Sequence, residues 1–174
     1  MNDAFFKKNE NEGFKLFQDF NQKLKIQDLT RAVEREHYDA SGHTSLNEVV
    51  EIEIKKRNLE LSKRGEKWIM SNEKFTADTV MIESHKLCSL LLDYQCNGII
   101  PLYVNFFNNE YVVVYNLSKF KSRPEEKTFA IYSNGYQFKQ FERRAFLKLK
   151  EGWIYKKEND NYKLIQKGFE TFDG

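Results

Sequence analysis

The sequence predicts a mixed α/β (α+β) fold in which amphipathic helices pack on a sheet of β-strands. Residues 11–25 and 84–97 place apolar side chains at helical spacing. Residues 49–56 alternate apolar and charged side chains, and residues 99–117 contain two β-rich runs. Because the chain has 174 residues, of which 40% are hydrophobic, it can bury one full core, and we expect a single domain over residues 1–174.

Composition excludes several classes of protein. No apolar run approaches the roughly 20 residues of a membrane-spanning helix, and residues 1–8 lack the apolar centre of a secretory signal. We therefore expect a cytoplasmic location and no membrane partner. Cys88 and Cys96 agree with this expectation, because on one helix their Cα atoms are roughly 12 Å apart, too far for a disulfide.

The first third of the chain predicts a helix followed by a hairpin. Residues 11–25 form the helix, whereas residues 29–40 can either extend it or begin a strand. Residues 41–47 are rich in turn formers. We expect a strand that ends near Asp39, a loop, and a second strand over about 48–56.

The middle third predicts a loop, a short strand and a well-defined helix. Residues 57–78 show no clear period and carry many charges, which is typical of a long loop. A short strand at residues 79–82 leads into the helix at 84–97. Gly98 follows at the position where a glycine commonly ends a helix.

The remaining residues are predicted to be rich in β-structure. Residues 99–107 and 111–117 form two strands joined by a turn. Beyond them, a β-rich C-terminal segment covers residues 118–174. Its expected strands are 129–132, 146–149, 153–155 and 162–165.

The strongest functional signal lies in residues 49–56 and in the aspartate that precedes them, Asp39. As a strand, this stretch places Val50, Ile52 and Ile54 on one face and Glu51, Glu53 and Lys55 on the other. Two carboxylates and an amine therefore share one surface.

Asp39, Glu53-Ile54-Lys55 and the strand-then-helix unit 82–86 stand in the order seen in the PD-(D/E)xK nuclease superfamily. Over about residues 10–117 the chain resembles that superfamily, with Asp39 matching its aspartate and Glu53-Ile54-Lys55 matching (D/E)xK. The resemblance implies a restriction-endonuclease-like core, in which helices flank a mixed central sheet on both faces. The chain departs from the pattern at Tyr38, which stands where the motif often has proline.

The resemblance implies an Mg²⁺-dependent or Mn²⁺-dependent endonuclease that hydrolyses phosphodiester bonds in DNA. Asp39 and Glu53, with the backbone carbonyl of Ile54, are the implied metal ligands. These oxygen ligands suit a hard cation, which can make water nucleophilic and neutralise phosphate charge. Lys55 is then expected to position the attacking water or stabilise the phosphate.

Several further residues are candidates for this site. Lys86, at the start of the helix after the motif, is expected to contact phosphate or support the site, with Glu83 beside it. Glu12, in the first helix, is a further metal-ligand candidate, as first-helix acids are in some members of the superfamily. A basic cluster after the motif is expected to bind the nucleic-acid backbone; it comprises Lys56, Arg57, Lys63 and Arg64. Two-strand cleavage favours a homodimer.

Two alternatives stay open. Glu-x-Lys is a common pattern, and it occurs again at Glu125-Glu126-Lys127, which follows Pro124 and is expected to be a charged loop. Glu53 and Lys55 can therefore belong to a solvated strand face. A non-catalytic module of the same fold that binds nucleic acid or protein is the second alternative. His37 and His43, beside Asp39, are expected at the surface, and Glu51 is expected to be a support or surface residue.

Overall fold

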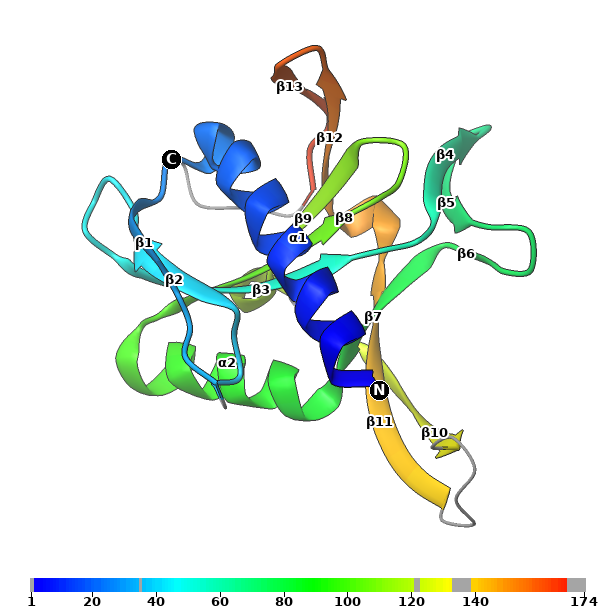
Figure 1. The fold of residues 1–174 in the computed structure, drawn as a ribbon, viewed down its shortest axis with the longest axis horizontal. Coiled ribbons are helices and arrows are strands. Elements are labelled where there is room, and N and C mark those ends of the chain that lie inside the picture. The colour runs from blue at the N-terminus through cyan, green and yellow to red at the C-terminus, as the bar shows by residue number, and fades with distance from the viewer. Residues whose placement is uncertain (1, 35, 121–122, 133–138, 169–174) are drawn as a thin grey trace.

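The computed structural model is a mixed α+β structure with three sheets, and it describes residues 2–34, 36–120, 123–132 and 139–168 (Figure 1). In these residues, the α-helices are α1 (Asn2–Leu24) and α2 (Ser84–Asn97), and the short 3-10 helices are η1 (Leu117–Lys119) and η2 (Leu149–Glu151). The large sheet has seven strands in the order β1 (Gln27–Arg31), β2 (Ala40–His43), β3 (Val49–Lys56), β8 (Ile100–Phe106), β9 (Tyr111–Asn116), β12 (Trp153–Glu158) and β13 (Asn161–Gln166).

Two smaller antiparallel sheets complete the structure. One has the order β10 (Glu125–Tyr132), β11 (Lys139–Lys148) and β7 (Thr79–Glu83). The other consists of β4 (Glu60–Arg64), β5 (Lys67–Ser71) and β6 (Thr76–Ala77). The β10–β11 and β4–β5 hairpins extend away from the large sheet (Figure 1).

The large sheet is mixed because β3 and β8 are parallel, whereas its other neighbouring strands are antiparallel. A parallel pair cannot be closed by a tight turn and needs a crossover connection. The chain between β3 and β8 supplies this crossover and contains α2. This connection brings α2 over one face of β3.

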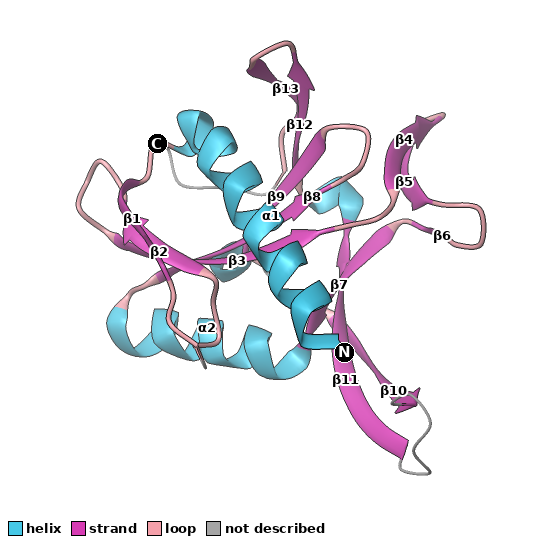
Figure 2. Cartoon of the chain, in the orientation of Figure 1, coloured by secondary structure: helices cyan, strands magenta, loops and turns pink. Residues whose placement is uncertain are grey.

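A hydrophobic core lies on each face of β8, whereas β3 contributes apolar side chains to only one of the two cores. On one face, Phe17 and Phe20 of α1 pack with Ile52 and Ile54 of β3, and α1 lies across these strands (Figure 2). On the other face, Leu87 of α2 belongs to a separate core that includes residues of β7, β9 and β11. The alternation predicted for residues 49–56 is therefore confirmed, since the two faces of β3 face different helices.

Most of the predicted elements are confirmed. The strand at 48–56, the short strand before α2, α2 itself and the last hairpin all form. Gly98 ends α2 in the left-handed conformation, with φ of 67°. The first helix begins earlier than predicted, at Asn2.

The predicted position of the first hairpin strand is wrong. β2 begins at Ala40 and runs to His43, so three of its four residues lie in the stretch 41–47 that was predicted to be a loop. β1 occupies residues 27–31. Gly42 explains the difference, because it permits a close approach of β1. A Cβ atom at Gly42 would lie 2.5 Å from Ile26 Cγ2 and 2.7 Å from the Gln27 carbonyl oxygen.

The predicted loops at 57–78 and 125–127 are also wrong. Residues 60–77 form the sheet of β4, β5 and β6, because Leu61, Trp68 and Met70 are buried in the core on the α2 face. Many exposed residues around these three are charged. In so short a stretch, the charged residues hide the alternation of the apolar ones. The second Glu-x-Lys lies in β10, where pairing with β11 satisfies its backbone.

The C-terminal segment extends the same structure. β11 pairs with β7, and β12 pairs with β9 at the side of the large sheet opposite to β1. Across the described ranges, neither α-helix has the length and apolarity needed to cross a membrane.

We expect Gly42→Ala to destabilise the fold by about 1–3 kcal/mol, because the added methyl group forces β1 and β2 apart. Urea or thermal unfolding measures this change. Leu46→Ala is the control, since Leu46 lies in the loop of the same hairpin and is 75% exposed; it should change stability by less than about 0.5 kcal/mol. Equal stability of Gly42→Ala and the wild type would contradict the close packing of β1 on β2.

Candidate active site

The β2–β3 hairpin places Asp39 beside the centre of β3. Ala40 pairs with Ile52, and the Asp39 amide donates to the Ile52 carbonyl oxygen at 2.9 Å. The Asp39 side chain is also held, because its Oδ2 accepts from the Ile54 amide at 2.7 Å. Main chain and side chain of Asp39 are thus fixed to β3 on either side of Glu53.

Glu53 is a buried carboxylate on the face of β3 that α2 covers. The residue is 4% exposed, and its Oε1 accepts a hydrogen bond from Lys86 Nζ at 2.5 Å. Its Oε2 is buried and has no hydrogen-bond partner within the described ranges. Burial, followed by the negative charge of Asp39, raises the pKa of Glu53 to about 7, although Lys86 opposes the rise.

Lys86 comes from the first turn of α2 and neutralises Glu53. Burial alone would lower the pKa of Lys86, but the charge of Glu53 and their hydrogen bond outweigh it, so the pKa is raised. Asp39 and Glu83 add to this effect. Lys86 is therefore positively charged at neutral pH, and it can stabilise negative charge but not act as a base.

Lys55 shares a small cavity with Glu53. The cavity has a volume of about 100 Å³, and Lys55 at its border is exposed to solvent. The other lining residues are Arg57, Met81, Ile82, Glu83, Lys86, Tyr103 and Arg144. Glu53 thus faces a cavity whose border is rich in cationic side chains.

Arg57 is held by acceptors inside the fold. Its Nε donates to Asn105 Oδ1 at 2.9 Å. Its Nη2 donates to the Met81 carbonyl oxygen at 2.7 Å and to the Tyr103 hydroxyl at 2.6 Å. These bonds join the end of β3 to β7 and β8, beside the cavity.

The other basic residues predicted to bind nucleic acid lie in two places, with Lys56 beside α1 and with Lys63 and Arg64 in β4. Lys56 pairs with Glu12 of α1, and this hydrogen bond lowers the pKa of Glu12. In the alternation of β3, Lys56 lies on the same face as Ile54, which packs against α1. Glu12 is therefore on the face of the sheet opposite to Glu53 and is not brought to it. Lys63 and Arg64 are exposed in β4, in the hairpin that extends from the large sheet (Figure 1).

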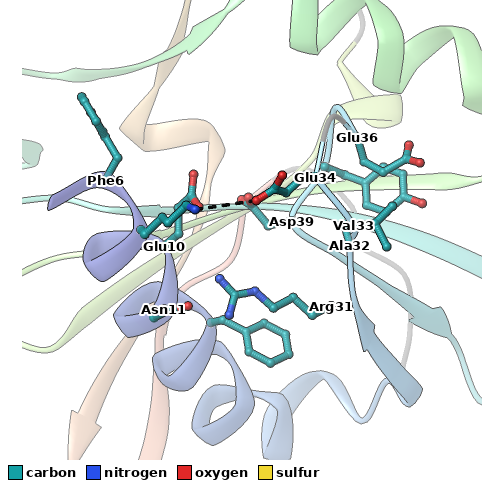
Figure 3. A pocket seen from close by; sticks show the side chains of 12 residues that line it. Phe6, Glu10, Asn11, Arg31, Ala32, Val33, Glu34, Glu36 and Asp39 are labelled. Atoms are coloured by element: carbon teal, nitrogen blue, oxygen red, sulfur yellow. Dashed lines mark ion pairs between the residues drawn. The ribbon is translucent and has the colours of Figure 1, made fainter. Parts of the chain in front are cut away.

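A larger cavity, of about 550 Å³, lies between the N-terminal half of α1 and the segment that leads to β2 (Figure 3). Asp39 lines this cavity together with Arg31 and Lys7, and Lys7 Nζ lies 3.8 Å from Glu34 Oε1. The lining has more carboxylates than cations. Asp39 therefore connects an open, mainly acidic cavity to the buried Glu53.

Sequence reasoning missed a neighbouring cluster on the same face of β3. Glu51, predicted to be a support or surface residue, is 6% exposed and is therefore not a surface residue. It lies beside His37 and Asp93. His37, also expected at the surface, is half-buried and pairs with Asp93. Asp93 follows Lys86 by seven residues, or two helical turns, so both face the sheet. The seven-residue spacing of Lys86 and Asp93 could have predicted that Asp93 faces β3.

Comparison with models of protein families, with curated protein sequences and with solved structures yields no match. The site is therefore interpreted from its own geometry. Asp39, in the bend just before β2, and Glu53, in β3, offer carboxylate oxygens. Lys86 holds the Glu53 carboxylate, and Lys55 lies at the solvent border. Such a set can hold a hard divalent cation and stabilise the charge of a phosphate.

Glu53 gives the folded protein a distinctive pH dependence. Its folded pKa of about 7 lies above the ordinary value of 4.5, so the folded state binds its proton more tightly than the unfolded state. This contribution to stability is complete below about pH 4.5 and is lost as the pH rises through about 7. Glu53→Gln cannot titrate at this position, so we expect the variant to lack this loss. Between pH 5 and pH 8, the free energy of unfolding of the wild type should fall relative to that of Glu53→Gln by up to roughly 3 kcal/mol.

Urea unfolding of the wild type and Glu53→Gln across this pH range measures the effect. Glu125→Gln is the control, because Glu125 belongs to the second Glu-x-Lys and its side chain is 73% exposed. The difference between Glu125→Gln and the wild type should not change with pH. A pH-independent difference for Glu53→Gln would contradict the raised pKa of Glu53.

Proposed function

We propose that the protein is an Mg²⁺-dependent nuclease that hydrolyses phosphodiester bonds in DNA, with Asp39 and Glu53 as metal ligands. The observation that carries this proposal is the position of the Asp39 carboxylate, which is anchored to β3 one residue beyond Glu53. The two acids of the PD-(D/E)xK pattern are thereby neighbours. The large mixed sheet with a helix on each face is consistent with the restriction-endonuclease-like core that the resemblance implies.

The donor atoms fit a hard cation. Asp39 and Glu53 supply carboxylate oxygens, and Glu53 Oε2 is buried without a hydrogen-bond partner in the part of the chain that the structure describes. A buried, unsatisfied carboxylate oxygen is costly, and a cation can satisfy it. Mg²⁺ or Mn²⁺ bound there supplies a water that is nucleophilic near neutral pH and charge that neutralises the phosphate.

The lysines have different roles in this proposal. Lys86 orients Glu53 through their hydrogen bond, and its charge lowers the free energy of an ionised Glu53 in the buried site. Lys55 is exposed at the border of the cavity, where its ammonium group can contact the attacking water or a phosphate oxygen. Lys63 and Arg64 can contact the DNA backbone at a distance from the reaction.

The test is cleavage of linear, circular, single-stranded and branched DNA by the purified protein with Mg²⁺ or Mn²⁺. We expect cleavage that EDTA abolishes, and a loss of at least roughly 10²-fold in rate for both Asp39→Asn and Lys55→Ala. Lys127→Ala is the matched control, because Lys127 is the exposed lysine of the second Glu-x-Lys. It should cleave at the wild-type rate.

Circular dichroism should show that all three variants are folded. Cleavage that survives both Asp39→Asn and Lys55→Ala would contradict the catalytic assignment. Binding of DNA without cleavage of any of these substrates would instead support the alternative function, a non-catalytic nucleic-acid-binding module.

A further inference from the structure

A second polar cluster lies next to the candidate active site, on the same face of β3. Glu51 contributes it from β3, His37 from the segment between β1 and β2, and Asp93 from α2. His37 Nε2 lies 3.4 Å from Glu51 Oε2 and 2.6 Å from Asp93 Oδ2. One ligand atom from each residue lies within 4.8 Å of the other two.

Glu51 is the buried member of this cluster. Its side chain is 8% exposed, whereas those of His37 and Asp93 are each 27% exposed. Glu51 Oε2 is buried and accepts no hydrogen bond from the described residues. Burial, followed by the negative charge of Asp93, raises the pKa of Glu51 to about 7. Two carboxylates and one imidazole thus converge on one place.

We propose that His37, Glu51 and Asp93 bind a divalent transition-metal ion, with Zn²⁺ as the best match. One imidazole nitrogen and two carboxylate oxygens are a mixed ligand set that suits Zn²⁺, whereas Mg²⁺ and Ca²⁺ prefer oxygen alone. A cation between the carboxylates satisfies Glu51 Oε2 and removes their repulsion. Three protein ligands leave one position for water on the solvent side.

One of the distances already matches a zinc site, and a second requires a small adjustment. Ligand atoms around a tetrahedral Zn²⁺ with bonds of about 2.0–2.1 Å lie roughly 3.3 Å apart. The separation of His37 Nε2 and Glu51 Oε2, 3.4 Å, already has this value. The contact between His37 and Asp93, at 2.6 Å, is a hydrogen bond and must open by roughly 0.7 Å to admit the ion.

This metal site is separate from the proposed catalytic pair. Asp39 and Glu53 approach Lys86, whereas this cluster uses Asp93, two turns further along α2. Because His37 precedes Asp39 by two residues, an ion here fastens the segment that carries Asp39 to both β3 and α2. The inference concerns the binding of the ion and does not rest on the proposed nuclease activity.

The test is Zn²⁺ binding by untagged protein, measured by calorimetry with Zn²⁺ alone in the Asp39→Asn background, which removes one acid of the other site. We expect one tightly bound Zn²⁺, and at least a 10-fold weaker affinity after His37→Ala or Asp93→Asn. Zn²⁺ should also raise Tm by about 5–10 °C when its free concentration is about 100-fold above Kd. His85→Ala is the control, because His85 is an exposed histidine of α2 and should retain binding.

One further measurement tests the site in the wild-type protein, so it does not depend on whether a variant folds. In the wild-type protein, the ring resonances of His37 should shift on addition of Zn²⁺ in nuclear magnetic resonance spectra, whereas those of His85 should not. Unchanged His37 resonances, undiminished affinity in a folded His37→Ala variant, or preference for Mg²⁺ over Zn²⁺ would overturn the assignment. A protein that binds Zn²⁺ through His37 but cleaves no DNA would support this site and contradict the nuclease proposal.

Discussion

The burial of two carboxylates beneath α2 is the constraint on which the rest of the structure depends. Glu51 and Glu53 are both less than 10% exposed, and an ionised carboxylate in such a place is costly unless a cation or a donor accompanies it. α2 supplies Lys86 to one acid, and the segment before β2 supplies His37 to the other. α2, β3 and the segment before β2 must therefore assemble together, because each buried carboxylate depends on a partner from another element for its stabilisation.

Much of the fold follows from periodicity in the sequence. Residues 49–56 and 84–97 have strong patterns and form the predicted strand and helix. The sequence was less informative where a tertiary contact overrides a local preference. Gly42 and its neighbours resemble a turn, yet they form β2 because the absence of a side chain admits β1. Likewise, β4 buries only Leu61 and β5 only Trp68 and Met70, and an apolar period this short does not distinguish a strand from a loop.

The candidate site was predictable to the extent that it depends on strand alternation. Alternation places Glu51, Glu53 and Lys55 together, and burial of the two acids bears out their shared face. Alternation does not reveal how deeply a side chain is buried, because α2 determines the burial of this face. Glu51 was therefore expected to be a support or surface residue. Lys86 was a candidate from its place after β7, but its pairing with Glu53 depends on the direction in which α2 crosses β3.

The parallel pairing of β3 with β8 has a consequence for the order in which the protein folds. During synthesis, the acidic strand emerges well before its neighbour, because β4 to β7 and α2 intervene in the chain. Until β8 has left the ribosome, β3 can pair with β2, but the edge of β3 that later binds β8 stays unpaired. The nonlocal contacts with β8 are slow to form. During this interval, Glu51 and Glu53 of the nascent chain are exposed to water. They lose their hydration only when β8 pairs with β3.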